Sequence, residues 1–148
     1  MGVDALDDLY REVILDHYKS PRHHGQLVPH DVEQEGYNPL CGDRIILQLQ
    51  FQEDRLKDIR FSGQGCSISQ AAASILTEET IGKSISDIRE EIGFFKRMMK
   101  GEVSEDQQDL GDLEALCGVR NFPVRIKCAL LPWTTLEEAL DFYINKEK

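Results

Sequence analysis

The stretch RIILQLQFQEDRLKDIRFS, residues 44–62, decides the fold because it predicts two strands that pair with each other. Apolar side chains occupy every second position of its first half, at Ile45, Leu47, Leu49 and Phe51. Alternation of this kind is typical of a strand that buries one face. Glu53 and Asp54 predict a tight turn, and residues 57–62 return as a second strand. The stretch therefore predicts an antiparallel hairpin with one polar face.

Further strand and helix signals precede the hairpin. Residues 31–36 predict a short edge strand, and residues 37–39, Tyr-Asn-Pro, predict the turn that follows it. Residues 5–19 have the apolar spacing of an amphipathic helix. We expect His17 to be a surface residue, or a residue at the boundary between surface and core.

Helices are predicted after the hairpin. Ser67 and Gln70 have capping-box spacing at the start of a helix over residues 69–81, and apolar spacing predicts another over residues 85–99. Strands followed by helices predict an α+β fold, in which a small antiparallel three-stranded sheet has helices packed on one face. Because no repeat or linker divides the chain, we expect one domain over residues 1–148.

The last helix is predicted to begin at Pro123, since proline is favoured at the first helical position. Pro132 is expected to kink this helix, and Thr134 with Glu137 can cap a new start beyond the kink. Between the predicted helices, residues 102–114 hold six acidic and no basic side chains. We expect this acidic stretch to be a solvated loop.

The composition excludes several classes of protein. The 148 residues include 27 acidic and 17 basic side chains, which gives a formal net charge of −10. This charge argues against a nucleic-acid partner, because phosphate contacts need clustered Lys and Arg. No apolar run is long enough to span a membrane, and the N-terminus lacks the basic-then-apolar pattern of a secretory signal. We therefore expect a cytoplasmic protein with reduced thiols and no membrane partner.

Four cysteines, Cys41, Cys66, Cys117 and Cys128, show no CxxC spacing, and structural burial is the ordinary explanation for each. Three of them lie in similar settings. Cys41 comes two residues before Asp43 and the first hairpin strand, Cys66 follows the second strand, and Cys128 lies early in the last helix. The hairpin places the first two at the same end. If Cys128 joins them, three sulfurs and one carboxylate oxygen meet, a set that suits tetrahedral Zn²⁺.

Cys41 is the predicted nucleophile. It lies in a loop flanked by proline and glycine, so it can move at little backbone cost, whereas Cys66 and Cys128 are tied to helix starts. Arg125 comes three residues before Cys128 and projects from nearly the same helix face. Its guanidinium can stabilise sulfur anions. We therefore expect Cys41 and Arg125 to carry the chemistry.

Four motifs carry a resemblance to a known family. They are LYREVILDHYKSPRHHG (residues 9–25), NPLCGDRI (38–45), FSGQGCSIS (61–69) and FPVRIKCALLPW (122–133). With these motifs in this order, the chain resembles the U-type proteins of iron–sulfur cluster assembly, the IscU, NifU N-terminal and SufU superfamily. The resemblance covers roughly residues 6–133.

Two departures resemble the SufU branch of that superfamily. Lys127 stands where IscU-type scaffolds have a histidine, and residues 93–113 form an acidic insertion. The resemblance implies a zinc site with four ligands, Cys41, Asp43, Cys66 and Cys128. It also implies that Cys41 accepts sulfur from the persulfide of a SufS-type cysteine desulfurase and that Arg125 lies close by. The sulfur would then pass to a downstream iron–sulfur assembly scaffold.

The sequence leaves alternatives open. The four proposed ligands could instead hold a [2Fe–2S] cluster, which would make the chain a scaffold, or zinc could only stabilise an interaction module. Cys117 is expected to be a buried structural cysteine, with a fourth-ligand or secondary-thiol role as alternatives. His23, His24 and His30 are expected to lie in a solvated loop rather than in a metal site.

Overall fold

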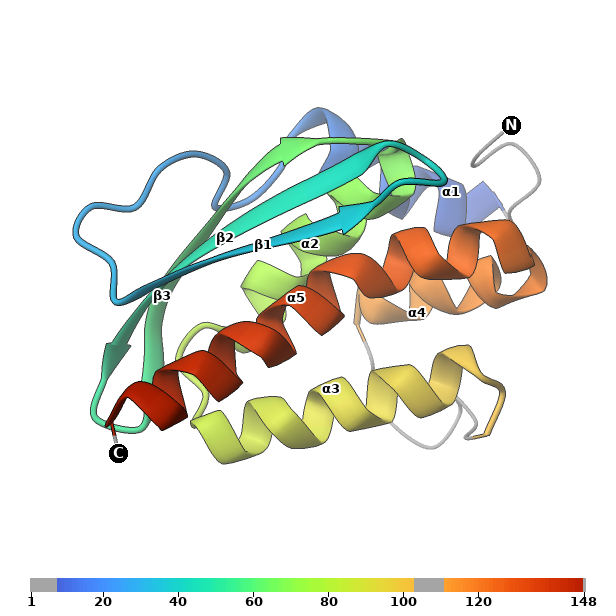
Figure 1. The fold of residues 1–148 in the computed structure, drawn as a ribbon. Coiled ribbons are helices and arrows are strands. Elements are labelled where there is room, and N and C mark those ends of the chain that lie inside the picture. The colour runs from blue at the N-terminus through green and yellow to red at the C-terminus, as the bar shows by residue number, and fades with distance from the viewer. Residues whose placement is uncertain (1–7, 103–110, 148) are drawn as a thin grey trace.

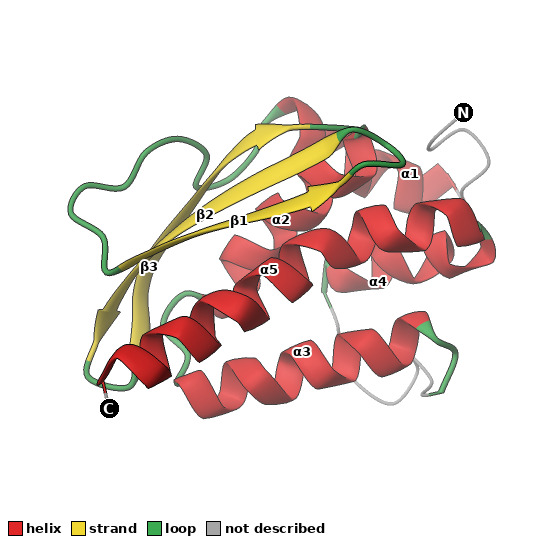
Figure 2. Ribbon diagram, in the orientation of Figure 1, coloured by secondary structure: helices red, strands yellow, loops and turns green. Residues whose placement is uncertain are grey.

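The computed structural model describes residues 8–102 and 111–147, and Figure 1 shows how its elements are arranged. In chain order they are α1 (Asp8–Lys19), β1 (Val32–Asn38), β2 (Asp43–Gln52), β3 (Arg55–Gln64), α2 (Ser67–Thr80), α3 (Ile85–Met99), α4 (Leu113–Cys117), the 3₁₀ helix η3 (Gly118–Asn121) and α5 (Pro123–Glu147). The predicted α+β fold is confirmed, since helices pack on one face of a three-stranded sheet (Figure 2). Within the described ranges, no helix is both long and apolar enough to cross a membrane.

The sheet is antiparallel and has the order β1-β2-β3, so β2 is its central strand. β1 is longer than predicted, because Asn38 pairs with Asp43 as the last rung before the loop of residues 39–42. β3 is also longer than predicted and reaches Gln64, which pairs with Arg44. These two extensions bring the loop of residues 39–42 and the chain that follows β3 to the same end of the sheet.

Two helices contact the sheet directly. α5 runs along β1 and β2, while α2 packs against β3 (Figure 1). α1 then lies against α2, and α3 lies against α5. At the centre of the core, the fully buried rings of Phe95 and Trp133 stack with their centroids 4.8 Å apart. The start of α5 lies over the same end of the sheet as the loop of residues 39–42, because Sγ of Cys128 is 3.2 Å from Sγ of Cys41.

The start of α2 differs from the predicted capping box. The helix begins at Ser67, and the residue that caps it is Cys66. The Sγ atom of Cys66 accepts a hydrogen bond from the backbone N–H of Ser69 at 3.5 Å, which satisfies one of the unpaired donors of the first turn. A predicted metal ligand and the helix cap are therefore the same side chain.

α5 begins at Pro123 as predicted, but the predicted new start beyond Pro132 is wrong, because one helix continues through this residue. Proline has no N–H, so the carbonyl of Cys128, four residues earlier, lacks its usual intrahelical donor. The hydroxyl of Thr134 donates to the carbonyl of Leu131 at 3.1 Å within the continuous helix and does not cap a new one. Burial of Trp133, next to Pro132, helps hold both halves of the helix against the core.

The other predicted helices agree with the structure. α3 has the predicted bounds, and α1 is confirmed from Asp8 onward, while the predicted residues 5–7 lie outside the described residues. Residues 103–110 of the acidic stretch also lie outside them. The last part of that stretch is not a loop, because α4 begins at Leu113 and buries this side chain.

Candidate metal centre

The loop between β1 and β2 carries Cys41 to the end of the sheet. Because Asn38 and Asp43 pair directly, residues 39–42 must turn tightly, and Gly42 does so with a φ of +71°. Cys41 is half-buried, whereas Asp43, the first residue of β2, is fully buried. The turn places both side chains at one end of the sheet.

The structure brings all four predicted ligands to this end. One donor atom each from Cys41, Asp43 and Cys128 lies within 4.8 Å of the other two, and the Sγ atoms of Cys41 and Cys128 are 3.2 Å apart. Cys66 stands beside this group, with its Sγ 3.9 Å from Oδ2 of Asp43. Two sulfurs and one carboxylate therefore meet where β2 begins and α5 starts, and the third sulfur, that of Cys66, lies beside them after the end of β3.

The two oxygens of Asp43 have different tasks. Oδ1 accepts hydrogen bonds from the backbone N–H of Cys66 at 2.8 Å and from the hydroxyl of Ser69 at 3.1 Å. Oδ2 instead faces the thiol of Cys66. Ligands in metal sites are commonly held by such outer hydrogen bonds, which fix the direction of the remaining lone pairs. The protein thus orients one carboxylate oxygen toward the sulfurs.

Asn38 is a second residue that orients the ligands, although the sequence pattern predicts only a turn at this position. Its buried amide Nδ2 lies 3.5 Å from Oδ2 of Asp43 and 3.7 Å from Sγ of Cys128, and it donates to both. The prediction of a turn over residues 37–39 hid this role, because the pairing of Asn38 in β1 aims its side chain inward. The available signal was its position at the start of the NPLCGD motif.

The sequence alone indicates that Ser69 caps the helix, but in the structure Cys66 is the cap. The structure gives Ser69 two contacts at the site, since its hydroxyl donates to Asp43 and its backbone N–H donates to Cys66. Gly65 leaves the space for this arrangement, because a Cβ atom there would overlap Oδ1 of Asp43 and lie 2.7 Å from the Ser69 hydroxyl. Glycine is therefore required at position 65, because the side chains of Asp43 and Ser69 come too close to leave room for a Cβ atom.

The thiols differ in their tendency to ionise. A hydrogen bond from the Cys128 thiol lowers the pKa of Cys66 to about 6, and the backbone N–H of Ser69 adds to this effect. The same interaction, together with burial, raises the pKa of Cys128. In the metal-free site, the thiol of Cys66 therefore ionises more readily than that of Cys128.

Arg125 lies in the first turn of α5, as predicted, and interacts with the sulfurs. Burial opposes its charge, but a hydrogen bond with Cys128 and the charges of Cys66, Cys128 and Cys41 outweigh this, so the pKa of Arg125 is raised. Its Nε is buried and has no hydrogen-bond partner among the described residues. The guanidinium therefore has a donor left for an anion at the site.

The donor set fits Zn²⁺. Sulfur and carboxylate oxygen are ordinary zinc ligands, and the hydrogen bonds from Ser69 and Asn38 supply the outer support that such ligands usually have. The same sulfurs are also of the kind that hold iron–sulfur clusters. Lys127, next to Cys128 on α5, is exposed. The donor set alone accommodates either centre.

Other candidate residues lie elsewhere. Cys117 is buried in α4, with its Sγ 3.2 Å from Sδ of Met98, which confirms the expected structural cysteine. His23 contacts the hydroxyl of Thr77 at 3.0 Å, and Nδ1 of His30 lies 2.8 Å from the carbonyl of Leu27. In the described part of the chain, the histidines of this loop form no metal-binding group with one another.

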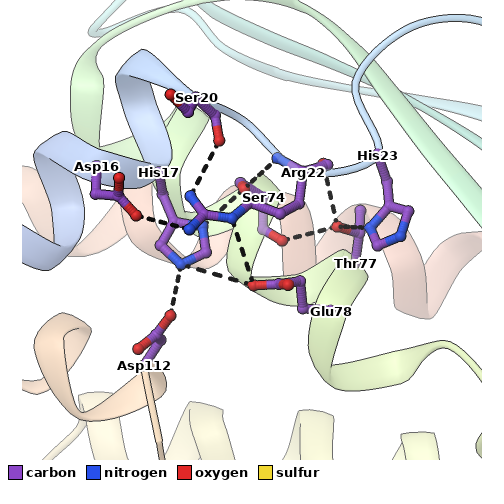
Figure 3. A network of polar contacts seen from close by, with 9 residues as sticks. All are labelled: Asp16, His17, Ser20, Arg22, His23, Ser74, Thr77, Glu78 and Asp112. Atoms are coloured by element: carbon purple, nitrogen blue, oxygen red, sulfur yellow. Dashed lines mark hydrogen bonds and ion pairs between the residues drawn. The ribbon is translucent and has the colours of Figure 1, made fainter.

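The prediction for His17 is wrong. This side chain is fully buried, because the face of α1 that carries it packs against α2. Figure 3 shows its ring between Ser74 and Asp112, with both ring nitrogens in polar contacts of 2.7 Å. Apolar periodicity does not reveal such a residue, since its partners come from distant parts of the sequence.

Comparison with known proteins gives consistent matches over most of the chain. Residues 9–147 match the family described as NifU-like N terminal domain. The chain is 47% identical over 135 residues to a Bacillus subtilis (strain 168) protein named zinc-dependent sulfurtransferase SufU, covering 91% of each. It is 44% identical over 147 residues to a Streptococcus pyogenes serotype M1 protein named iron–sulfur cluster assembly scaffold protein IscU, covering 99% of this chain and 92% of that one.

A solved structure agrees in both fold and sequence. It is a candidate iron–sulfur cluster assembly scaffold protein for the SUF system from Fervidobacterium islandicum AW-1. The two structures superpose with a TM-score of 0.82 at 37% identity, over 87% of this chain and 94% of the other. The resemblance predicted from the four motifs is thereby confirmed: this chain belongs to the NifU-like N-terminal domain family, within the IscU and SufU superfamily of iron–sulfur cluster assembly.

Proposed function

We propose that this chain is a zinc-dependent sulfurtransferase, which accepts persulfide sulfur from a SufS-type cysteine desulfurase and relays it to iron–sulfur cluster assembly. The observation that carries the proposal is the asymmetry of the three thiols. Cys128 is fully buried, and Cys66, although half-buried like Cys41, is fastened as the cap of α2, whereas Cys41 lies on a glycine-containing loop. A sulfur carrier needs one thiol that a partner can reach, and Cys41 meets this need.

Four residues would hold the zinc, namely Cys41, Asp43, Cys66 and Cys128. Bound zinc supplies one chemical property here: it keeps thiols in the thiolate form at neutral pH without redox reactions. The name of the Bacillus subtilis relative supports zinc over a cluster. The oriented carboxylate of Asp43 supports a mixed sulfur and oxygen site.

The transfer itself is thiolate attack on a persulfide. The Cys41 thiolate attacks the outer sulfur of the desulfurase persulfide and forms a new S–S bond with it. The S–S bond of the donor breaks at the same time, and the donor cysteine leaves as a thiolate. No oxidant or reductant is consumed, since one persulfide replaces another.

Arg125 would stabilise the charge on the product. Its guanidinium already interacts with Cys41, Cys66 and Cys128, and its buried Nε has no partner among the residues that the structure describes. A persulfide on Cys41 carries an anionic outer sulfur, which a nearby guanidinium stabilises. Arg125 is therefore proposed to favour transfer toward this chain.

Exposed apolar side chains surround the acceptor loop and are proposed to contact the desulfurase. Tyr37 and Leu40 flank the turn with 63% and 76% of their surface exposed, and Val124 at the start of α5 is 67% exposed. Apolar contacts between these side chains and the partner would exclude water from the site of sulfur transfer. Burying these side chains on the partner would bring Cys41 to the donor cysteine.

Desulfurase turnover with this protein as acceptor tests the proposal. Cysteine consumption should rise when wild-type protein is added, and Cys41→Ala should abolish the increase, with Cys117→Ala as the matched control at a thiol outside the site. Arg125→Ala should reduce the increase while zinc stays bound. Mass spectrometry should find one added sulfur on the Cys41 peptide. Added sulfur on Cys66 or Cys117, with Cys41 unmodified, would contradict the mechanism.

A second candidate function is a scaffold for a [2Fe–2S] cluster. It is favoured by the name of the Streptococcus pyogenes relative and by sulfurs that suit either centre. Metal analysis and colour separate the two functions, because a zinc protein is colourless and a cluster protein is brown. One zinc per protein purified without added metal supports the transferase, while iron with bound sulfide supports the scaffold.

A further inference from the structure

A second group of metal-binding side chains lies apart from the thiols. It comprises His17 from α1, Glu78 from α2 and Asp112 just before α4 (Figure 3). One donor atom from each lies within 4.8 Å of the other two. We propose that these three residues form a second, weaker binding site for a divalent transition-metal cation such as Zn²⁺.

His17 is already held as a metal-binding histidine would be. It is fully buried, and its Nδ1 lies 2.7 Å from the hydroxyl oxygen of Ser74. That oxygen also accepts the backbone N–H of Arg22 at 2.8 Å, and a hydroxyl oxygen has two lone pairs for two donors. Without a metal ion, Nε2 donates its hydrogen to Oδ2 of Asp112 at 2.7 Å. A bound cation would take the place of this hydrogen while Nδ1 donates to Ser74, which is the usual way a histidine ligand is oriented.

The two carboxylates are close to Nε2 and free to adjust. Oδ2 of Asp112 is 2.7 Å away and Oε1 of Glu78 is 3.8 Å away, and these side chains are 49% and 45% exposed. A pocket of about 240 Å³ lies beside them, lined by Ile75, Glu78, Glu79 and Asp112. Water in this pocket can complete the coordination of a cation held by one nitrogen and two oxygens.

A neighbouring cation limits the affinity. Nε of Arg22 lies 3.9 Å from Oε1 of Glu78, while another nitrogen of the same guanidinium pairs with Asp16 at 2.6 Å. This positive charge opposes a bound metal ion, so the site should be weaker than the thiolate site. For the same reason, removing the charge of Arg22 should strengthen metal binding.

The proposal is tested by titrating zinc-loaded protein, with one zinc per chain, with Co²⁺. Binding at His17, Glu78 and Asp112 should give a visible d–d absorption without the near-ultraviolet thiolate-to-cobalt bands of a cysteine site. Asp112→Asn and Glu78→Gln should each weaken this binding about ten-fold or more. Arg22→Gln should tighten it about two- to five-fold, as expected for one partly exposed charge.

Glu79→Gln is the matched control, since Glu79 lines the same pocket but lies outside the ligand group. It should weaken Co²⁺ binding by no more than about two- to five-fold, as expected for the loss of one neighbouring charge that is not a ligand. The carboxylate variants avoid the buried His17, whose loss could unfold the protein, and circular dichroism confirms that each variant is folded. The proposal is overturned if zinc-loaded protein gives no d–d absorption or only thiolate bands. It is equally overturned if Asp112→Asn binds Co²⁺ like wild type, or if Glu79→Gln weakens binding as much as Glu78→Gln does.

Discussion

The carboxylate of Asp43 accepts a 2.8 Å hydrogen bond from the backbone N–H of Cys66, across 23 positions of the sequence. This bond ties the first residue of β2 to the cap of α2. The same carboxylate oxygen accepts the hydroxyl of Ser69 one turn into the helix. Two of the proposed ligands are therefore held as one rigid unit, and Cys41 is left as the ligand on a loop.

Ser69→Ala should weaken the metal centre. The change removes one of the two donors to Oδ1 of Asp43, so the carboxylate loses part of its orientation. We expect zinc loss to a chelator to be about 10- to 100-fold faster, and the free energy of unfolding to fall by about 1 kcal/mol. Ser67→Ala, on the same helix but without a capping role, should change stability by less than about 0.5 kcal/mol. Equal effects of the two variants would contradict the orienting role of the Ser69 hydroxyl.

Gly65→Ala should disrupt the hydrogen-bonded unit of Asp43, Cys66 and Ser69, because the added Cβ atom overlaps with it. The new Cβ would meet Oδ1 of Asp43 and the hydroxyl of Ser69, so one of them must move. We expect the purified variant to hold less than half of the wild-type zinc and to lose about 1–3 kcal/mol of stability. Gly101→Ala is the control, because Gly101 also has a positive φ of +77° but has open space around it. It should be destabilised by backbone strain alone and keep its zinc, and zinc loss there would refute the steric argument.

The metal-free protein should show an unusually acidic thiol at Cys66. Its pKa is lowered to about 6, so the thiolate fraction, and with it the alkylation rate, should rise as the pH increases through 6 and level off above 7. Cys128, whose pKa is raised, should remain unreactive over that range. Iodoacetamide labelling at several pH values, read peptide by peptide by mass spectrometry, measures both. A Cys66 inflection near the ordinary thiol value of about 8.5 would count against the hydrogen bond from Cys128.

Lys127→His should separate the two candidate functions. Lys127 is exposed, so the change should alter the free energy of unfolding by less than about 0.5 kcal/mol. The new imidazole stands beside Cys128 and adds the ligand that IscU-type scaffolds have there. We expect the variant to retain a reconstituted [2Fe–2S] cluster longer than wild type, measured by visible absorbance, with the exposed Lys57→His as control. If wild type already retains the cluster as long as the variant, the scaffold function gains support.

The meeting of Cys41 and Cys66 at one end of the hairpin could be predicted from the sequence, because it depends on local pattern. Alternation from Ile45 to Phe51 fixes β2, and a tight turn then forces Cys41 and Cys66 to one end. Pro123 marks the start of α5 and so the approximate place of Cys128. These signals are short-range, and chain geometry converts them into a long-range meeting of side chains.

The supporting residues could not be predicted in the same way. Asn38 donates to Asp43 and Cys128, and His17 lies between Ser74 and Asp112, through contacts that no periodic pattern encodes. A buried polar side chain depends on whether its partners arrive in three dimensions. The predicted new helix start beyond Pro132 is wrong for a similar reason. Tertiary packing outweighs the local helix-breaking signal of proline, and α5 continues through this residue.

The use of Cys66 as a helix cap limits how this position can change during evolution. Serine is among the preferred capping residues, so Cys66→Ser keeps a capping oxygen at the start of α2 while removing one sulfur donor. Cys66→Ala removes both the capping atom and the sulfur donor. A substitution at position 66 that keeps a capping side chain, such as serine, should therefore preserve the fold while removing one of the three sulfur donors. A relative with serine at this position should keep the start of α2 but offer a metal ion two cysteine sulfurs instead of three.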